Sequence, residues 1–549
     1  MSKQIIFNQT AREALKRGID KVADAVKITI GPRGKNVVLD KGYGSPVITN
    51  DGVTIARDIS LSNKFENMGA EIMKEVASKT NDVAGDGTTT SIIIAQNLVE
   101  EGMKKVVLGV NAMGIKAGID KATEEVIKEL KNMAKPITNI EEIRQVATIS
   151  AESEKIGKII AETVDKVGKD GVVTVEESQS LGVESEVVEG MEFGRGYISP
   201  YMLTDTERME AEFRNPSILL TDKKISSVKE ILPFLEKMAE AGKKDLVVIA
   251  EDVEGEALTT FVLNKLRGSF NVLAIKAPEY GERKKEILED IAVTIGAKVV
   301  TGELGLKLEK AGLEVLGQAN KVISTKEKTI IVGGKGKKTE IENRINQLKK
   351  QLKLSSSKFD SEKIEERIAK LSGGVAVIKV GASTETEMKY LKLKIEDAVN
   401  ATKAAIEEGI IPGGGSALVR IADKISKKSF KSTLKHFEEE FQVGFNLLLR
   451  ALEAPLKQIA INAGKEDGSV IVNDVKKAKG GVGYDANSDT LVNDMISAGI
   501  IDPVKVARSA IQNAASSAGI LLTTEVAIAD EPKKEAGTTI GSRGGEDEM

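Results

Sequence analysis

NDVAGDGTTT, residues 81–90, places one carboxylate, Asp86, between two glycines and follows it with three threonines. A strongly apolar helical pattern continues from Ser91 to Val107. The stretch has a partner in NDGVT at 50–54, because both contain Asp-Gly-x-Thr directly before a helical pattern. An isolated turn of this kind is usually an N-cap, in which the aspartate accepts hydrogen bonds from free N–H groups of the first helical turn.

A site for phosphate and metal is the alternative interpretation of these turns. A helix N-terminus that follows glycines offers N–H donors to phosphate, and aspartate supplies the oxygen ligand that Mg²⁺ prefers. The general nucleotide motifs G-x-x-x-x-G-K-[ST] and G-x-G-x-x-G, and the kinase sequences H-R-D and D-F-G, do not occur in the sequence. Two more glycine-rich turns, GPRGK at 31–35 and PGGGS at 412–416, are individually weak signals.

Length and composition limit the class of protein. The 549 residues exceed the roughly 250 to 300 that one hydrophobic core usually holds, so two to four domains are expected. The formal net charge of -4 creates no field that would attract nucleic acid or an anionic membrane, and neither partner is expected.

The chain has no cysteine and one histidine, His436, which excludes disulfides, thiolate nucleophiles and sites built from several Cys or His ligands. No apolar segment approaches the ~20 residues that cross a bilayer. A soluble cytoplasmic protein is expected.

The two ends of the chain read as helical. Spacings of three and four predict a helix over 10–28, with Thr10 and Glu13 as a capping box. Further predicted elements are a hairpin of 36–40 with 46–49 around KGYGS, a helix over 111–133, and helix-rich sequence over 416–530. A discontinuous domain made from both ends is plausible, and the tail 531–549 should be disordered.

The middle of the chain alternates strand with helix, which favours a parallel α/β layer. The predicted strands are 245–252, 270–278 and 297–303, and the helices between them are 254–267 and 282–295. Residues 339–371 read as two charged helices with a turn in SSSKFD (355–360), and a buried strand over 373–381 leads into a helix over 384–408.

Large apolar residues are unusually dense in this middle region. Spacing alone favours core packing for them, although each stretch holds more than one buried stripe needs. If they are exposed, they would form an apolar binding surface. The set comprises Tyr197, Tyr201, Met202, Leu232, Phe234, Leu235, Met238, Leu258, Phe261, Val262 and Leu263.

Nine segments together closely resemble the group I chaperonins, the sixty-kilodalton heat-shock family of bacteria and organelles. The resemblance runs in order from residue 2 to about 530. The segments are GPRGKNVVLD (31–40), TNDGVTIARDI (49–59), KFENMGAEIMKEVASKTNDVAGDGTTT (64–90), VVEGMEFGRGYISPYM (187–202), AEDVEGEAL (250–258), GGVAVIKVGASTETEMKY (373–390), GGGSAL (413–418), EAPLKQIAINAG (453–464) and GIIDPVKVARSA (499–510).

The resemblance implies a multidomain α+β and α/β fold. A helical equatorial ATPase domain would comprise 1–133 and 408–530, and an intermediate hinge domain 134–188 and 375–407. An inserted α/β apical domain would comprise 189–374. The resemblance also implies an ATPase assembled as two stacked seven-membered rings. Such a homo-oligomer would capture unfolded or misfolded polypeptides on its apical rim and enclose them under a co-chaperonin of the ten-kilodalton family.

Matching motifs imply a site for ATP, Mg²⁺ and K⁺. Asp86 would bind Mg²⁺, while Asp51 and Asp397 would position the attacking water. The residues implied in contact with the nucleotide are Thr29, Gly31, Pro32, Asp86, Gly87, Thr88, Thr89, Thr90, Gly414, Gly415, Asp485, Ala486 and Asp502.

The resemblance also reverses the core-packing interpretation for part of the apolar set. The surface implied for unfolded polypeptide and co-chaperonin comprises Tyr197, Tyr201, Met202, Leu232, Leu235, Leu258, Val262 and Leu263. Arg195 and Glu385 match a pair that joins neighbouring subunits.

The chain departs from the family pattern in four places. Asn50 stands where Lys is common, which leaves the strength of K⁺ dependence open, and Glu152 stands where Asn is common. Residues 424–440 are longer and more charged than usual and are expected to form a solvated excursion. The tail ends in GGEDEM, which is acidic.

Two other functions are compatible with these residues. One is a phosphotransferase that acts on a small metabolite through the Asp-Gly turns. The other is a binding protein that keeps the apolar surface and has a vestigial ATPase. The length and order of the matching segments disfavour the first, and the presence of Asp51, Asp86 and Asp397 together disfavours the second.

Overall fold

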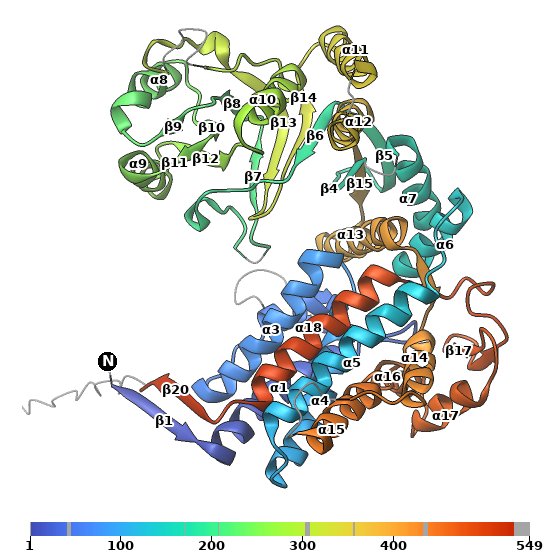
Figure 1. Cartoon of the computed structure of the whole chain (residues 1–549). Coiled ribbons are helices and arrows are strands. Elements are labelled where there is room, and N and C mark those ends of the chain that lie inside the picture. Colours follow the sequence, from blue (N-terminus) through green and yellow to red (C-terminus); the bar gives the residue numbers. More distant parts are fainter. Residues whose placement is uncertain are drawn as a thin grey trace, which may run out of the picture. The chain divides into compact units, whose positions relative to one another are not determined.

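The computed structural model describes residues 2–40, 46–168, 171–206, 208–301, 308–354, 357–431 and 437–531. The chain forms two compact units (Figure 1). The first comprises Met1–Ala134 and Ile411–Met549, and the second comprises Lys135–Ile410. The expected multidomain fold of mixed helix and sheet is confirmed, while the division into three domains stays a prediction.

The first unit begins with a strand that fixes the start of its first helix. β1 (Lys3–Phe7) pairs antiparallel with β20 (Val526–Asp530), and α1 (Asn8–Lys27) follows immediately. Phe7 is therefore the N-cap residue and provides no side-chain cap. The predicted capping box is wrong, because Thr10 already lies inside the helix that the paired strand begins.

Helices from both chain ends share one hydrophobic core in the first unit. Figure 1 shows α18, in red, among the blue helices of the N-terminal segment, which it contacts at α3, α4 and α5. Ile19, Met73, Leu98, Leu448 and Ile511 are among the buried side chains of this core. The other helices of the unit are α2 (Gly52–Asp58), α3 (Lys64–Ala84), α4 (Thr88–Val107), α5 (Ala112–Met133), α14 (Ser416–Ser426), α15 (Glu438–Ala451), α16 (Ala454–Asn462), α17 (Ser469–Lys477) and α18 (Val504–Leu522).

Three more pairs of short strands complete the first unit. β2 (Val37–Leu39) and β3 (Val47–Thr49) form the predicted antiparallel hairpin, whose turn at 41–45 lies outside the described residues. The remaining pairs are β16 (Ile410–Pro412) with β19 (Ile501–Pro503), and β17 (Gly483–Asp485) with β18 (Thr490–Val492).

The excursion expected at 424–440 contains the end of α14 and the start of α15. Lys424 and Lys428 each form an ion pair with Glu129 on α5, and their hydrogen bonds lower the pKa of Glu129 to about 2. Residues 432–436, which include His436, and most of the predicted disordered tail, 532–549, lie outside the described residues.

The second unit contains a seven-stranded mixed sheet. Its parallel part, β8 (Ser217–Leu220), β10 (Asp245–Ala250) and β12 (Asn271–Lys276), confirms the predicted α/β layer, with α9 (Gly255–Leu266) as the connection from β10 to β12. The antiparallel part was not predicted. It consists of β6 (Gly190–Phe193), β7 (Ala211–Arg214), β13 (Gly317–Ser324) and β14 (Thr329–Gly334).

The helix predicted over 282–295 is confirmed as α10 (Gly281–Ile295). The remaining elements of this part of the chain are η1 (Pro200–Met202), β9 (Lys224–Ile225), α8 (Val228–Glu240), β11 (Asp252–Val253), η2 (Leu308–Lys310) and η3 (Leu313–Val315). The strand predicted over 297–303 is wrong within the described residues, which end at 301 before the next gap. Val300 forms only an isolated bridge to Thr221. The hydroxyl of Thr221 donates to Val300 O (2.8 Å), so a side chain satisfies the carbonyl that a longer ladder would have paired.

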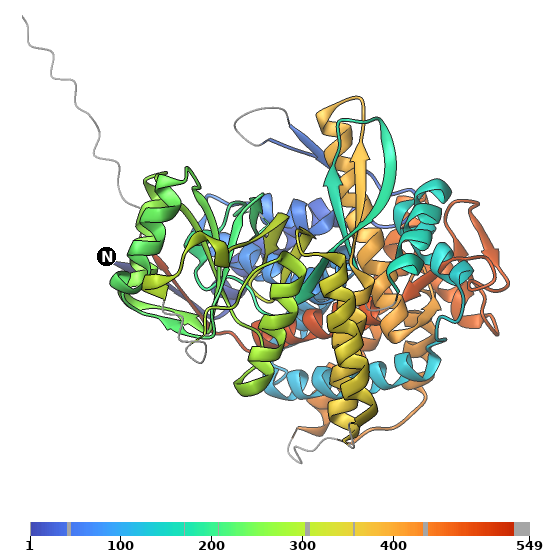
Figure 2. The same cartoon turned by 90° about the horizontal axis from the view of Figure 1, so that it is seen from above.

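A separate three-stranded sheet packs against helices of the second unit. Figure 2 shows the gold β15 (Val375–Gly381) between the teal β4 (Val172–Glu177) and β5 (Gly182–Val188). The helices beside it are α6 (Ile140–Ala151), α7 (Glu154–Val167) and α13 (Glu385–Glu408). β15 and α13 confirm the elements predicted at 373–381 and 384–408. Glu152 accepts a hydrogen bond from Lys394 of α13 (2.6 Å).

The predicted pair of charged helices is also confirmed, as α11 (Lys338–Leu354) and α12 (Lys358–Gly373). A buried carboxylate attaches this pair to α10. Asp290 accepts hydrogen bonds from Nε of Arg344 and from Nε of Arg367, each at 2.7 Å. The two charged helices therefore have an anchor besides their few buried apolar side chains.

A glycine contact between α5 and α15 generates the first prediction. A Cβ atom on Gly118 of α5 would overlap the backbone oxygen of Phe441 in α15. Because backbone cannot yield as a flexible side chain can, we expect Gly118→Ala to destabilise the first unit by about 2 kcal/mol or more in urea unfolding.

The matched control for this prediction is Gly519→Ala in α18. There the added methyl group would meet only the flexible side chain of Lys116. We expect that control to be neutral or stabilising by up to about 1 kcal/mol, because alanine favours helix more than glycine does. Equal stability of the two variants would show that α5 and α15 do not depend on this close approach.

Candidate functional site

Asp86 lies in a turn between two helices of the first unit. Gly85 and Gly87 both have left-handed backbone conformations, with φ of 68° and 82°. Gly87 is the N-cap residue of α4, and it provides no side-chain cap. The carboxylate of Asp86 accepts a hydrogen bond from the N–H of Gly87 (2.5 Å) but does not cap the helix. The N-cap interpretation is therefore wrong for Asp86.

Asp51 is a true N-cap, although its sequence motif is the same. Its carboxylate accepts hydrogen bonds from the N–H groups of Val53 (3.2 Å) and Thr54 (3.1 Å) at the start of α2. The side chain is buried. The two Asp-Gly-x-Thr motifs therefore place their aspartates differently. Asp51 caps α2, the helix that follows it, whereas Asp86 lies before α4 without capping it.

The two turns pack directly against each other. A Cβ atom on Gly52 would lie 2.6 Å from the hydroxyl oxygen of Thr89 and 2.7 Å from that of Thr88. Thr29, at the end of α1, has its hydroxyl 3.2 Å from that of Thr89. Gly52 was missed by sequence reasoning, and its position directly after Asp51 in the repeated motif was the available signal.

The glycine-rich turn before α14 contacts Asp502. The N–H groups of Gly414 and Gly415 donate to the carboxylate of Asp502, which β19 carries. Both glycines have positive φ, 60° and 75°, and the N–H of Gly413 donates to Ile500 O (2.9 Å). This turn and Asp502 therefore form one hydrogen-bonded structure.

Asp485 is the last residue of β17 and Ala486 follows it, close to the same turn, since a Cβ atom on Gly414 would lie 3.7 Å from Tyr484 O. Asp485 accepts hydrogen bonds from the N–H of Asn487 (2.9 Å) and the hydroxyl of Ser488 (2.7 Å), which fixes the turn. Ala486 is buried in a small core that also contains Leu456 and Ile459.

Arg33 attaches the loop of Gly31 and Pro32 to this region. Its guanidinium donates to the backbone oxygens of Ala463 (3.1 Å) and Asn487 (2.7 Å), over 400 residues away in the chain. Gly31 has φ of 86° and its Cα lies against Ile459. Sequence reasoning missed Arg33, because no local pattern indicates which distant carbonyl groups an arginine will reach.

Burial and mutual repulsion raise the pKa of two acids of the site, Asp86 and Asp502. Loss of hydration raises the pKa of Asp86 to about 6, against the hydrogen bond from Gly87, and the negative charge of Asp51 adds to the rise. Loss of hydration, followed by the charge of Asp86, raises the pKa of Asp502 to about 7 although two glycine N–H groups oppose it. Such carboxylates would be stabilised by a cation.

The donor set is suited to a cation that arrives with a phosphate ligand. Within the described ranges, no group of three or more Asp, Glu, His or Cys side chains could hold a metal ion by itself. Asp86 is one hard oxygen ligand, and the threonines at the start of α4 are hydroxyl donors beside it. Phosphate oxygens would have to complete the coordination of a metal bound here.

All but one of the predicted nucleotide residues belong to the first unit. These are Thr29, Gly31, Pro32, Asp51, Asp86, Gly87, Thr88, Thr89, Thr90, Gly414, Gly415, Asp485, Ala486 and Asp502. Asp397 belongs to the second unit, where it lies half-buried on α13. Its role stays a prediction.

The predicted apolar surface is divided between exposed and buried residues. Tyr201 is 71% exposed, whereas Tyr197 is 7% exposed and Met202 is fully buried. The expected exposure of Tyr197 and Met202 is wrong. Met202 Sδ accepts the N–H of Ala274 in β12 (3.2 Å), and Tyr197 bridges to the same strand at Ile275, so both belong to the core.

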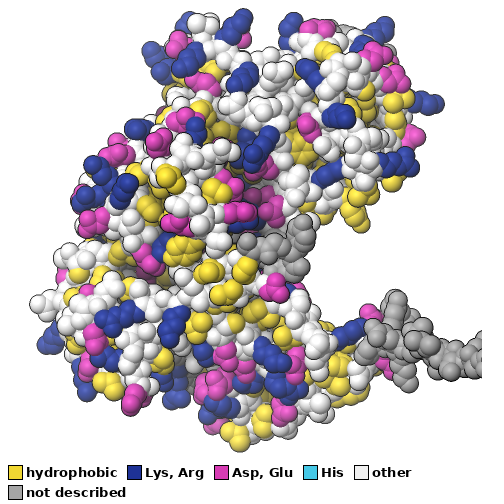
Figure 3. Space-filling view, turned by 180° about the vertical axis from the view of Figure 1, so that it is seen from behind, with side chains coloured by type: hydrophobic (Ala, Val, Ile, Leu, Met, Phe, Trp, Pro, Cys, Tyr) yellow, Lys and Arg dark blue, Asp and Glu magenta, His cyan; other side chains and the backbone are white. Residues whose placement is uncertain are grey.

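The other predicted surface residues lie on two helices. Leu232 on α8 and Leu263 on α9 are exposed, while Leu235, Leu258 and Val262 are half-buried. Phe234, Met238 and Phe261 face the core, as their spacing indicated. In Figure 3 hydrophobic side chains are visible among charged ones over the surface of the molecule.

Arg195 and Glu385 each have a partner within the chain. Arg195 Nη2 donates to the hydroxyl of Tyr280 (3.1 Å), and the guanidinium lies 5.5 Å from the centre of the Tyr280 ring. Glu385 forms an ion pair with Lys389 one helical turn later (2.7 Å). The contact between neighbouring subunits therefore stays a prediction.

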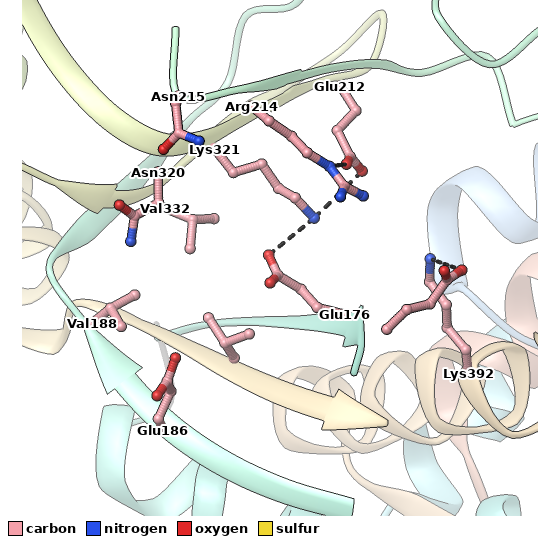
Figure 4. Close-up of a pocket in the computed structure, with 12 residues that line it drawn as sticks. Glu176, Glu186, Val188, Glu212, Arg214, Asn215, Asn320, Lys321, Val332 and Lys392 are labelled. Atoms are coloured by element: carbon pink, nitrogen blue, oxygen red, sulfur yellow. Dashed lines mark hydrogen bonds and ion pairs between the residues drawn. The ribbon is translucent and has the colours of Figure 1, made fainter. Parts of the chain in front are cut away.

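A hollow of about 230 Å³ lies between the seven-stranded and the three-stranded sheets of the second unit. Figure 4 shows Lys321 of β13 reaching across it to Glu176 of β4 (2.9 Å). The other charged side chains that line the hollow are also paired. The pairs are Glu212 with Arg214 and Lys321, Glu177 with Lys392, and Glu186 with Lys379. The hollow is therefore a region in which paired charged side chains connect the two sheets.

Comparison with known proteins gives the class of the chain. One unit holds acidic, glycine-rich turns suited to a phosphate ligand, and the other carries an apolar helical surface on a mixed sheet. A family model described as the TCP-1/cpn60 chaperonin family matches residues 22–532. The chain belongs to this chaperonin family, whose members are molecular chaperones that bind polypeptides and assemble into oligomeric rings. No helix within the described residues has the length and apolar character that crossing a membrane requires.

The raised pKa of Asp502 predicts a dependence of stability on pH. Because the folded unit binds this proton more tightly than the unfolded chain does, the stabilisation is complete below pH 3.8 and is lost as pH rises through about 7. Asp502→Asn removes the ionisation. We expect this variant, without ligand, to melt at least about 2 °C higher than the wild type at pH 8, with a smaller gain at pH 5.

The control for the pH experiment is Glu124→Gln, which changes an exposed acid on α5. It should shift the melting temperature by less than about 1 °C at both pH values. A gain for Asp502→Asn that is the same at both pH values would contradict the assigned cause.

Proposed function

We propose that this chain is a group I chaperonin that hydrolyses ATP to drive polypeptide folding. The proposal is that a ring of chains captures non-native polypeptides and encloses them, under a co-chaperonin lid, in a chamber of two stacked heptameric rings in the cytoplasm. The observation that carries it is the meeting of the Asp51, Asp86 and Asp502 turns in one unit of a chaperonin-family chain.

The proposed ATP site uses the contacts already described. The N–H groups and hydroxyls of Thr88, Thr89 and Thr90 would donate to the phosphates at the start of α4. The turn of Gly414 and Gly415, with Asp485, Ala486 and Asp502, would hold the ribose and adenine, and the loop that Arg33 anchors would cover them.

Asp86 would hold Mg²⁺ between the phosphates. When bound, Mg²⁺ offsets the negative charge that develops on the phosphoryl group. The raised pKa of Asp86 supports this role, because a carboxylate buried near Asp51 gains most from a neighbouring cation. Asp51 and Asp397 would orient the attacking water, and Asp397 would do so only when the second unit closes. Asn50 leaves a backbone carbonyl for K⁺.

Exposed strands support assembly into rings. The ribbon of β1 and β20 exposes Ile5, Phe7 and Ile528, and the β2–β3 hairpin exposes Val38. Isolated two-stranded ribbons are marginally stable in water, and exposed edges pair readily with other strands. A second copy of this chain is the partner that we propose for them.

Loss of Asp397 tests the hydrolytic assignment. We expect Asp397→Ala to bind ATP and assemble normally but to hydrolyse at least about 100-fold more slowly, because the carboxylate that orients water is lost. Single-turnover hydrolysis and equilibrium nucleotide binding measure the two effects separately. Asp86→Ala is the comparison, since it should lose Mg²⁺-dependent binding itself. Hydrolysis at the wild-type rate by Asp397→Ala would rule the assignment out.

The helical surface should capture unfolded polypeptide. We expect Val262→Ser on α9 to weaken capture of a denatured protein about fivefold, because it removes apolar area from a surface that binds without directional contacts. Pull-down of a labelled denatured protein measures the effect. Leu354→Ser is the control, because Leu354 is 86% exposed at the end of α11, away from α9. Equal capture by wild type and Val262→Ser would show that Val262 packs within the protein and does not bind the polypeptide.

A further inference from the structure

One ion pair attaches helix α13 to a turn of the seven-stranded sheet's domain. Arg208 Nη2 donates to Oε2 of Glu396 at 3.0 Å. Glu396 is the residue directly before Asp397 on α13, and its side chain is only 19% exposed. A displacement of Arg208 therefore acts on the helical turn that carries the proposed hydrolytic carboxylate.

Hydrogen bonds and an ion pair connect Asp205, Arg208 and Glu210. The N–H of Glu210 donates to Asp205 O, and the N–H of Asp205 donates to Glu210 O, each at 3.0 Å. The side chain of Asp205 accepts the N–H of Arg208 (2.9 Å), and Glu210 pairs with Arg208 Nε (3.2 Å). The guanidinium is thus directed at Glu396 by groups within its own turn.

The other end of this turn is attached to the apolar surface. Lys265, in the last turn of α9, donates to Leu203 O (2.7 Å). Leu203 directly follows η1, which carries the exposed Tyr201, and α9 carries Val262 and Leu263. A series of contacts therefore runs from the surface on α9 to Leu203, through Thr204 and Asp205 to Arg208, and from Arg208 to α13.

The pair is costly to break on one side only. Loss of hydration raises the pKa of Glu396, and the positive charges of Arg208 and Lys392 oppose the rise. Removing Arg208 would leave a carboxylate with little solvent and a weaker positive neighbour. The ion pair between Arg208 and Glu396 therefore attaches the turn to α13, so that the two are expected to move together.

We propose that Arg208 is a positioning residue that transmits the binding of an unfolded polypeptide on α9 to Asp397 on α13, and so alters the rate of ATP hydrolysis. The inference rests on the proposed function, in which α9 binds the polypeptide and Asp397 orients water. Arg208 itself touches neither ligand. Its effect is on the turnover number, because the nucleotide loops belong to the other unit of the chain.

Substitutions in the ion pair test this coupling in the full-length assembly. The measurement is the ATP turnover number with and without a reduced, alkylated polypeptide that stays unfolded. We expect the polypeptide to change wild-type turnover by at least about twofold, and Arg208→Ala or Glu396→Gln to abolish that change with nucleotide affinity kept. Arg208→Lys, the conservative variant, keeps a positive charge beside Glu396 and should keep at least part of the response.

Arg214→Ala is the matched control, because Arg214 lies on the next strand and pairs only locally with Glu212 among the described residues. It should keep the wild-type response. A full response in Arg208→Ala, loss of the response in Arg208→Lys as complete as in Arg208→Ala, or no response in the wild type would each overturn the proposal. Asp397→Ala is measured in parallel. Hydrolysis at the wild-type rate by Asp397→Ala would contradict the proposed function, whereas the outcomes above contradict only the role of Arg208.

Discussion

The repulsion among Asp51, Asp86 and Asp502 is the constraint on which the first unit depends. Three turns from distant parts of the chain bring these acids close together, and their mutual repulsion adds to the loss of hydration that raises the pKa of Asp86 and Asp502. The fold tolerates this because the backbone around them is rigid: Asp51 caps α2, the N–H groups of two glycines hold Asp502, and Gly52 packs on the α4 threonines. A site that is unfavourable without a cation is selective for ligands that bring one.

Helix periodicity and strand alternation were sufficient to predict many of the helices and part of the sheet structure. β15, α13 and the α11–α12 pair agree closely with the predicted ranges, because their apolar spacing is regular and their ends carry clear signals such as Thr384. The start of α1 was wrong for a reason that lies outside its own sequence. A strand paired with residues over 500 positions away determines where that helix begins.

Prediction of the candidate site from local sequence is limited in the same way. Asp51 and Asp86 have identical local motifs, yet only Asp51 caps its helix, because Gly87 takes the capping position after Asp86. No pattern in the sequence distinguishes the two. Met202 and Tyr197 similarly share a motif with the exposed Tyr201, but contacts with β12 bury them. Arg33 and Arg208 escaped prediction since their partners are distant in the chain.

The pairing of β1 with β20 has a consequence for biosynthesis. The ribosome delivers residues 3–7 more than 500 residues ahead of residues 526–530, so this ribbon cannot form until the later strand has emerged. The same applies to α18, which completes the core around α3, α4 and α5. The segment from 135 to 410 emerges as a continuous stretch and is free to fold earlier. Helices α1 to α5 must therefore wait, with apolar faces uncovered, for partners that come much later in the chain.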